Sequence, residues 1–134
     1  MTIHSADEFV RLRYSDDPAN YQRAAGEEAA VDVWHDVINR YPDARMWVAQ
    51  NKTVPLEILA ILVSDADAEV RRMVVMKRKL TPDLLDQLAM DDDESIRMRV
   101  AMHKNVAEET LQRLRDDSWD RIREVVTERL GDSN

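Results

Sequence analysis

Hydrophobic and polar residues follow the period of an α-helix through most of this chain. Val70, Met73 and Val74 are spaced i, i+3, i+4, which places them on one face of a short amphipathic helix. Thr81 and Pro82 then have the residue types of a helix N-cap and first turn, and leucines at helical spacing follow them. The pattern predicts two short helices joined by a turn.

This pair of helices recurs with a period of 26 residues, most clearly in a column of four arginines: Arg45, Arg71, Arg97 and Arg123. The same offset separates valines, leucines and aspartates, which form the columns Val48, Val74, Val100 and Val126; Leu59, Leu85 and Leu111; Leu62, Leu88 and Leu114; and Asp65, Asp91 and Asp117. A single pair of short helices cannot bury its apolar faces, whereas stacked neighbours build one continuous core. The sequence therefore predicts an all-α fold of stacked helix pairs.

The two ends of the chain depart from the repeat. Residues 1–41 are predicted to form an N-terminal helical cap and degenerate repeat, in the same domain as the repeats of residues 42–134. A terminal repeat closes the core on one side and is therefore atypical. We expect a helix over residues 5–13, a buried Trp34, and a last helix that stops at Gly131 as its C′ glycine.

Composition excludes several classes of function. The 134 residues include no cysteine, so a disulfide framework, a thiol nucleophile and a cysteine-held cluster are excluded. The two glycines cannot form a phosphate-cradling loop, and the three histidines have no metal-binding spacing. There is no signal-type N-terminus and no apolar run long enough to span a membrane. We expect a cytoplasmic, non-enzymatic protein without a cofactor, a metal or a membrane contact.

The repeat also resembles a known family. The residues that carry the resemblance are Val70-Arg71, Val74-Val75, Leu84-Leu85, Leu88-Ala89 and Asp91, with their echo in Ile96-Arg97, Val100-Ala101, Leu111, Leu114 and Asp117. They are similar to the leucine-rich repeat variant family of short HEAT-like helical repeats, over roughly residues 42–130. The resemblance implies a short right-handed α-solenoid with a non-catalytic binding surface. In that family an Asn follows the first helix of each repeat; Asn51 matches this, whereas Lys77 and His103 depart from it.

The arginine column, Arg45, Arg71, Arg97 and Arg123, allows two interpretations. In the first, each guanidinium pairs with an aspartate of an adjacent turn, such as Asp65 or Asp91, or with carbonyls at a helix end. In the second, the column is exposed to phosphates or to an acidic peptide. The spacing alone leaves both open.

Candidate partner-binding residues fall into three groups. A basic column lies in the turns that follow the first helix of each repeat: Lys52, Arg78 and Lys104. An acidic run lies in the other kind of turn, at the opposite edge of a solenoid: Asp91, Asp92, Asp93 and Glu94. The acidic run is also typical of a solvated turn that places negative charge at the start of a helix. Trp47 and Trp119 are the third group, because tryptophan is enriched at interface hot spots.

These features favour a small protein-protein interaction module. One alternative is an immunity or inhibitor protein whose acidic edge neutralises a basic toxin such as a nuclease. Another is a nucleic-acid-binding or base-repair protein, since some DNA glycosylases resemble HEAT-like solenoids. The net charge of -8 opposes the attraction to phosphate on which nucleic-acid binding depends, so we expect a protein partner.

Overall fold

The computed structural model of the chain describes residues 2–131, and nearly all of the regular secondary structure in this part of the protein is helical. Its elements are β1 (Thr2–Ile3), α1 (Ala6–Arg13), α2 (Pro18–Gly26), β2 (Glu28–Ala29), α3 (Val31–Arg40), the 3-10 helix η1 (Pro42–Ala44), α4 (Arg45–Gln50), α5 (Leu56–Leu62), α6 (Ala68–Val75), α7 (Pro82–Leu88), α8 (Glu94–Met102), α9 (Glu108–Leu114) and α10 (Asp120–Arg129). The all-α prediction is confirmed. None of the described helices combines the length and the apolar character needed to cross a membrane.

The helix bounds follow the 26-residue period of the sequence. α5, α7 and α9 begin at Leu56, Pro82 and Glu108, and they end at the column Leu62, Leu88 and Leu114. α6, α8 and α10 begin at Ala68, Glu94 and Asp120, again 26 residues apart. Each period of the sequence therefore yields the predicted pair of short helices.

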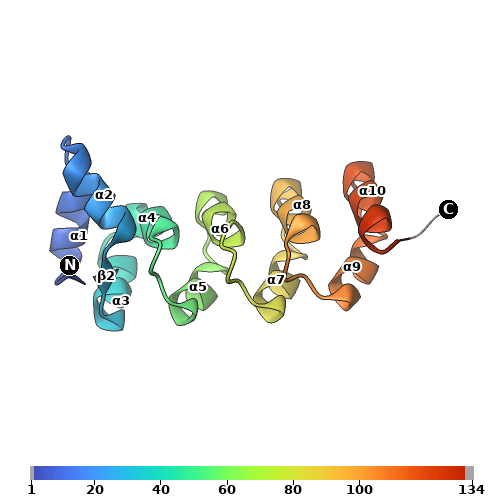
Figure 1. Ribbon diagram of the computed structural model, residues 1–134, viewed down its shortest axis with the longest axis horizontal. Coiled ribbons are helices and arrows are strands. Elements are labelled where there is room, and N and C mark those ends of the chain that lie inside the picture. The colour runs from blue at the N-terminus through green and yellow to red at the C-terminus, as the bar shows by residue number, and fades with distance from the viewer. Residues whose placement is uncertain (1, 132–134) are drawn as a thin grey trace. The chain divides into compact units, whose positions relative to one another are not determined.

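The chain divides into two compact units, a first unit of Met1–Val74 and a second unit of Val75–Asn134. In the first unit α1 packs against α2 and α3 (Figure 1). Ser5 caps α1 by accepting the Glu8 N–H at 3.0 Å, which confirms the helix expected over residues 5–13. Trp34 of α3 is fully buried, as expected, and its ring meets Phe9 edge-on at a centroid distance of 5.2 Å. Both rings are fully buried, so the aromatic pair belongs to the core of this unit.

A short sheet in the first unit was not expected from the sequence. β1 and β2 pair in parallel, with Thr2 opposite Glu28 and Ile3 opposite Ala29. Ile3 is fully buried, so the pairing fixes the start of the described chain onto the core of α1 to α3. Two residues are too few for strand periodicity to be recognised in a sequence.

In the second unit α8 and α10 lie side by side, and α7 and α9 form a second pair beside them (Figure 1). The Thr81 side chain caps α7 by accepting the Leu84 N–H at 3.4 Å, with Pro82 in the first turn. Four residues of the repeat columns are buried in these helices, together with two isoleucines: Leu85, Leu88, Val100 and Val126, with Ile96 and Ile122. α10 ends before Gly131, whose φ of 73° confirms it as the C′ glycine.

Candidate protein interaction site

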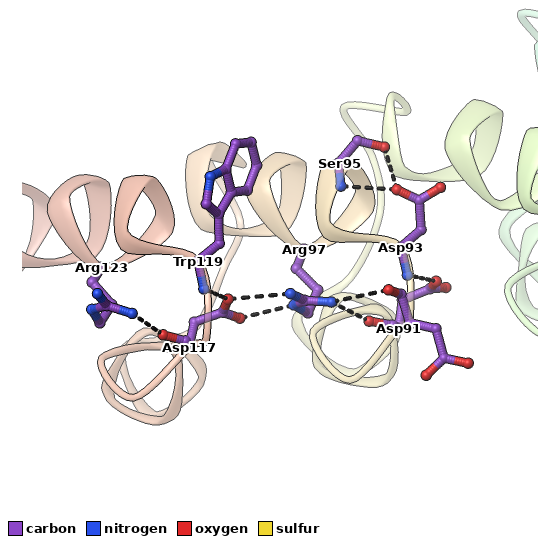
Figure 2. A network of polar contacts seen from close by, with 8 residues as sticks. Asp91, Asp93, Ser95, Arg97, Asp117, Trp119 and Arg123 are labelled. Atoms are coloured by element: carbon purple, nitrogen blue, oxygen red, sulfur yellow. Dashed lines mark hydrogen bonds and ion pairs between the residues drawn. The ribbon is translucent and has the colours of Figure 1, made fainter.

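The arginine column forms a dense network of polar contacts in the second unit (Figure 2). Arg97 makes a two-pronged ion pair with Asp117, with Nε to Oδ2 at 2.8 Å and Nη2 to Oδ1 at 3.2 Å. Its Nη1 also donates to the carbonyl of Asp91 at 2.8 Å. The two charged side chains are well shielded from solvent, with 14% and 5% of their areas exposed. Arg97 therefore joins the turn before α8 to the turn before α10.

Other members of the column repeat parts of this geometry. Arg123 donates to the Asp117 carbonyl at 2.6 Å, as Arg97 does to the carbonyl six residues before it. In the first unit Arg71 donates to the Asp65 carbonyl at 2.7 Å, and Arg45 reaches the Asp65 carboxylate at 3.5 Å. The contacts within each unit are those of the first interpretation, in which the arginines bind turns of their own fold.

Electrostatics in the second unit follow from this network. Burial raises the pKa of Asp117, but the hydrogen bonds from Arg97 and from the Trp119 N–H, with the charges of Arg97 and Arg123, outweigh burial and hold the pKa below its ordinary value. The same hydrogen bond, which Arg97 donates to Asp117, raises the pKa of Arg97. Both groups are therefore charged throughout the physiological pH range.

Two members of the acidic run serve the turn between α7 and α8. Asp93 caps α8 by accepting the Ser95 N–H at 2.8 Å, and Asp91 accepts the Asp93 N–H at 2.9 Å (Figure 2). The side chains of Asp92 and Glu94 are exposed. Glu94 lies in the first turn of α8, where negative charge is favourable.

A second polar column, formed by Asn51, His103 and Arg129, hydrogen-bonds backbone carbonyls near the C-terminal ends of helices. Asn51 follows α4, and its fully buried Nδ2 donates to the carbonyls of Ala24 at 2.8 Å and Glu27 at 3.0 Å. Its Oδ1 accepts the N–H of Thr53 at 2.8 Å. The side chain thus satisfies carbonyls left open at the end of α2.

His103 performs the same task in the second unit with a different side chain. Its Nδ1 accepts the Asn105 N–H at 3.0 Å, so the proton is on Nε2, which donates to the Lys77 carbonyl at 2.8 Å. Arg129 lies 26 residues later and donates to the His103 carbonyl, also at 2.8 Å. His103 and Arg129 therefore each bind the carbonyl of the residue one period earlier. The sequence analysis placed Asn51 and His103 at equivalent positions of the repeat, but it did not identify the hydrogen-bonding role of His103 or the place of Arg129, because these residues share a function and not a residue type.

Lys77 occupies the equivalent position after α6 and is partly buried. Burial lowers the pKa of Lys77 to about 8, and the nearby charge of Lys79 acts in the same direction. The folded chain therefore holds this proton less tightly than the unfolded chain. Since the unfolded state binds more protons between the two pKa values, the contribution of Lys77 to stability rises as the pH increases above about 8.

Replacing His103 with alanine is expected to lower the free energy of unfolding by about 1–3 kcal/mol, because the Asn105 N–H and the Lys77 carbonyl lose a partner where water has little access. Replacing it with asparagine should cost less than half of that, since the chain itself uses Asn51 at this position of the repeat. Urea denaturation of the two variants measures the difference. Equal losses would mean that the imidazole contributes packing and not these hydrogen bonds.

Two residues of the predicted basic column meet in one open pocket of the second unit. Arg78 and Lys104 line it together with Arg99, around the exposed methionines Met76 and Met102. The pocket has a volume of about 290 Å³, and its lining includes the buried Val75 and His103 but neither aspartate nor glutamate. In the part of the chain that the structure describes, no ion pair joins its three cations to a carboxylate. The pocket lies where α6 and α8 end.

The remaining candidate residues lie elsewhere. Lys52 is exposed after α4 in the first unit, and its backbone N–H donates to the Ala25 carbonyl at 2.8 Å. Trp47 is partly buried, with one face of its ring covered by the Arg13 guanidinium at 3.4 Å. Trp119 is the N-cap residue of α10 and is partly exposed. Among the candidates in the second unit, only Arg78 and Lys104 are brought to the pocket.

Arg99, Met76 and Met102 belong to the pocket but were not singled out as site residues. Two signals in the sequence point to them. Met76 and Met102 are separated by one period of 26 residues, and Arg99 is three positions before Met102 on the same helix face. What the sequence does not show is that both methionines remain exposed, at 55% and 57%.

The described residues contain no cluster of three or more histidine, aspartate or glutamate side chains suited to a metal ion. Both ring nitrogens of His103 are already hydrogen-bonded within the protein. Comparisons with protein-family models, with curated proteins and with solved structures find no match to this chain. The function of the site is therefore inferred from the chemistry of its own residues.

Proposed function

We propose that this protein is a non-enzymatic protein-protein interaction module, built as a short right-handed α-solenoid of HEAT-like repeats. The observation that carries the proposal is the pocket formed by Arg78, Arg99, Lys104, Met76 and Met102. It combines cations that form no ion pair with a carboxylate of the described residues 2–131 with exposed apolar side chains. Exposed apolar side chains that are bordered by polar ones are typical of surfaces that bind a partner.

The polar networks support this choice by elimination. The arginine column and its aspartates are hydrogen-bonded to turns within each unit, so they stabilise the fold. The column that contains Asn51, His103 and Arg129 satisfies carbonyls at helix ends. Among residues 2–131, no side-chain hydrogen bond or ion pair ties Arg78, Arg99 or Lys104 to the fold in this way.

The inhibitor alternative, which depends on the acidic run, has weaker support. Asp91 and Asp93 hold the turn before α8, and only Asp92 and Glu94 of that run have exposed side chains. Two exposed carboxylates beside a helix N-terminus also have an ordinary local role. The pocket is therefore the better candidate for the partner-binding surface.

The proposal predicts that reversing the charge of the pocket abolishes partner capture without unfolding the protein. Arg78→Glu combined with Lys104→Glu should remove the proteins that the wild-type chain captures from native lysate, because both side chains are exposed and contribute little to stability. Helicity by circular dichroism should stay unchanged. Mass spectrometry of the captured fraction gives the result.

The matched control is Arg11→Glu combined with Arg121→Glu, which changes the net charge by the same amount at exposed positions outside the pocket. This pair should capture the same proteins as the wild type. A separate Lys52→Glu variant tests whether the basic column acts beyond the second unit. Identical capture by the pocket pair and the wild type would overturn the proposed function.

A further inference from the structure

The chemistry of the pocket restricts what can fill it, and this step rests on the proposed function. We infer that its ligand is an acidic peptide segment with a central apolar side chain, in which the apolar side chain rests on Met76 and Met102 and flanking carboxylates meet Arg78, Arg99 and Lys104. The ligand is thus a short linear segment of a partner protein. Each part of this inference follows from a separate property of the pocket.

The methionines define the apolar part of the ligand. Met76 and Met102 expose 55% and 57% of their surface, and both line the same depression. Methionine is flexible and polarisable, so a pair of exposed methionines adapts to different apolar side chains. The volume of about 290 Å³ is at the lower limit of small-molecule pockets, which suits one large side chain and its backbone.

The three cations define the charge of the ligand. Arg78 and Lys104 lie in the turns after α6 and α8, and Arg99 lies on α8, so positive charge borders the methionines from both helix ends. The negative ends of the helix dipoles favour a cation near each end, which accounts for one basic residue per helix. The helix dipoles do not account for the third cation of the pocket, nor for the exposed methionines that lie beside the cations. Complementary carboxylates would neutralise this local charge and specify the ligand.

The same features favour a peptide over a nucleic acid. Proteins that bind single-stranded nucleic acids use aromatic side chains on which bases stack. The lining of this pocket contains no Phe, Tyr or Trp, and its one imidazole, His103, is buried and hydrogen-bonded through both ring nitrogens. The whole chain carries a net charge of -8, which repels an extended polyanion but affects a short segment much less at physiological salt. A short acidic segment therefore fits both the local and the global charge.

The test measures fluorescence anisotropy of short fluorescein-labelled peptides with the full chain. Peptides with a central leucine, phenylalanine or methionine between paired glutamates should bind, and binding should weaken as salt is raised. Replacing the central residue with serine should weaken binding by about tenfold or more, because the apolar contact is lost. Replacing the glutamates with lysines should abolish binding.

Variants of the protein locate the binding site. Met76→Ser combined with Met102→Ser should reduce the affinity for the apolar-centred peptides to that for the serine-centred one, whereas Met90→Ser, at a residue 73% exposed outside the pocket, should have no effect. Arg99→Ala should weaken binding of every acidic peptide, and Arg121→Ala should not. Because all five positions lie on the surface or at its edge, the variants are expected to fold.

Two results would overturn the inference. The first is that no acidic peptide binds more tightly than its serine-centred or lysine-flanked control. The second is that a labelled single-stranded oligonucleotide binds the wild type more tightly than the peptides do, and that the pocket variants lose this affinity. If the peptides fail while Arg78→Glu with Lys104→Glu still loses its captured proteins, the error lies in the partner chemistry and not in the proposed function.

Discussion

Replacing Leu85 with alanine should lower the free energy of unfolding by about 2–5 kcal/mol, the range found for buried leucines. Leu85 belongs to a leucine column of the repeat and is fully buried in α7. The variant loses the burial of the side chain and also leaves a cavity that its short helices can close only in part. Urea denaturation followed by circular dichroism measures the loss.

Arg78→Ala is the control for this experiment, because Arg78 is exposed in the turn before α7. It should change the free energy of unfolding by no more than about 0.5 kcal/mol. Small and equal effects of Leu85→Ala and Arg78→Ala would show that the leucine column does not form the core.

Replacing Asp117 with alanine should cost about 3 kcal/mol, as expected when one partner of a shielded ion pair is removed. The variant leaves the Arg97 guanidinium, 14% exposed, without its carboxylate, and leaves the Trp119 N–H without an acceptor. Asp116→Ala is the matched control, since it removes an exposed carboxylate from the neighbouring position and should cost no more than about 0.5 kcal/mol.

The pH dependence of stability separates the ion pair from simple packing. The pKa of Asp117 is below its ordinary value in the folded chain, so its contribution is complete above the unfolded pKa and is lost as the pH falls through the folded pKa. Asp117→Asn should therefore be less stable than the wild type at neutral pH, and the difference should shrink in acid. A difference that is constant down to the acid range would argue against the charge of Asp117 as its source.

The candidate interaction site was only partly predictable. The basic column identified Arg78 and Lys104, but Lys52 lies in the first unit, and Arg99, Met76 and Met102 complete the pocket instead. A column of repeats shows that side chains emerge from equivalent points of each unit. It does not show which side chains from different helices converge or which apolar ones remain uncovered, because these depend on packing.

For the arginine column, too, the spacing in the sequence could not decide the role of the side chains. Its spacing allowed a structural or an exposed role, and the difference depends on distances that spacing does not contain. Arg97 lies 2.8 Å from the Asp117 carboxylate, in a setting where both side chains are shielded. His103 is a similar case, because an imidazole with this tautomer reproduces the donor and the acceptor of an asparagine.

The sequence by itself determined the all-α class, the 26-residue pairs of helices, the leucine columns of the core, the Thr81 cap and the Gly131 stop. These features are local, since helical periodicity, capping and glycine conformation act within a few residues of each other. Only the tertiary structure decided which charges are neutralised and which remain exposed. The reason is that residues 20 or more positions apart, such as Arg97 and Asp117 or His103 and Lys77, meet only after the helices have packed.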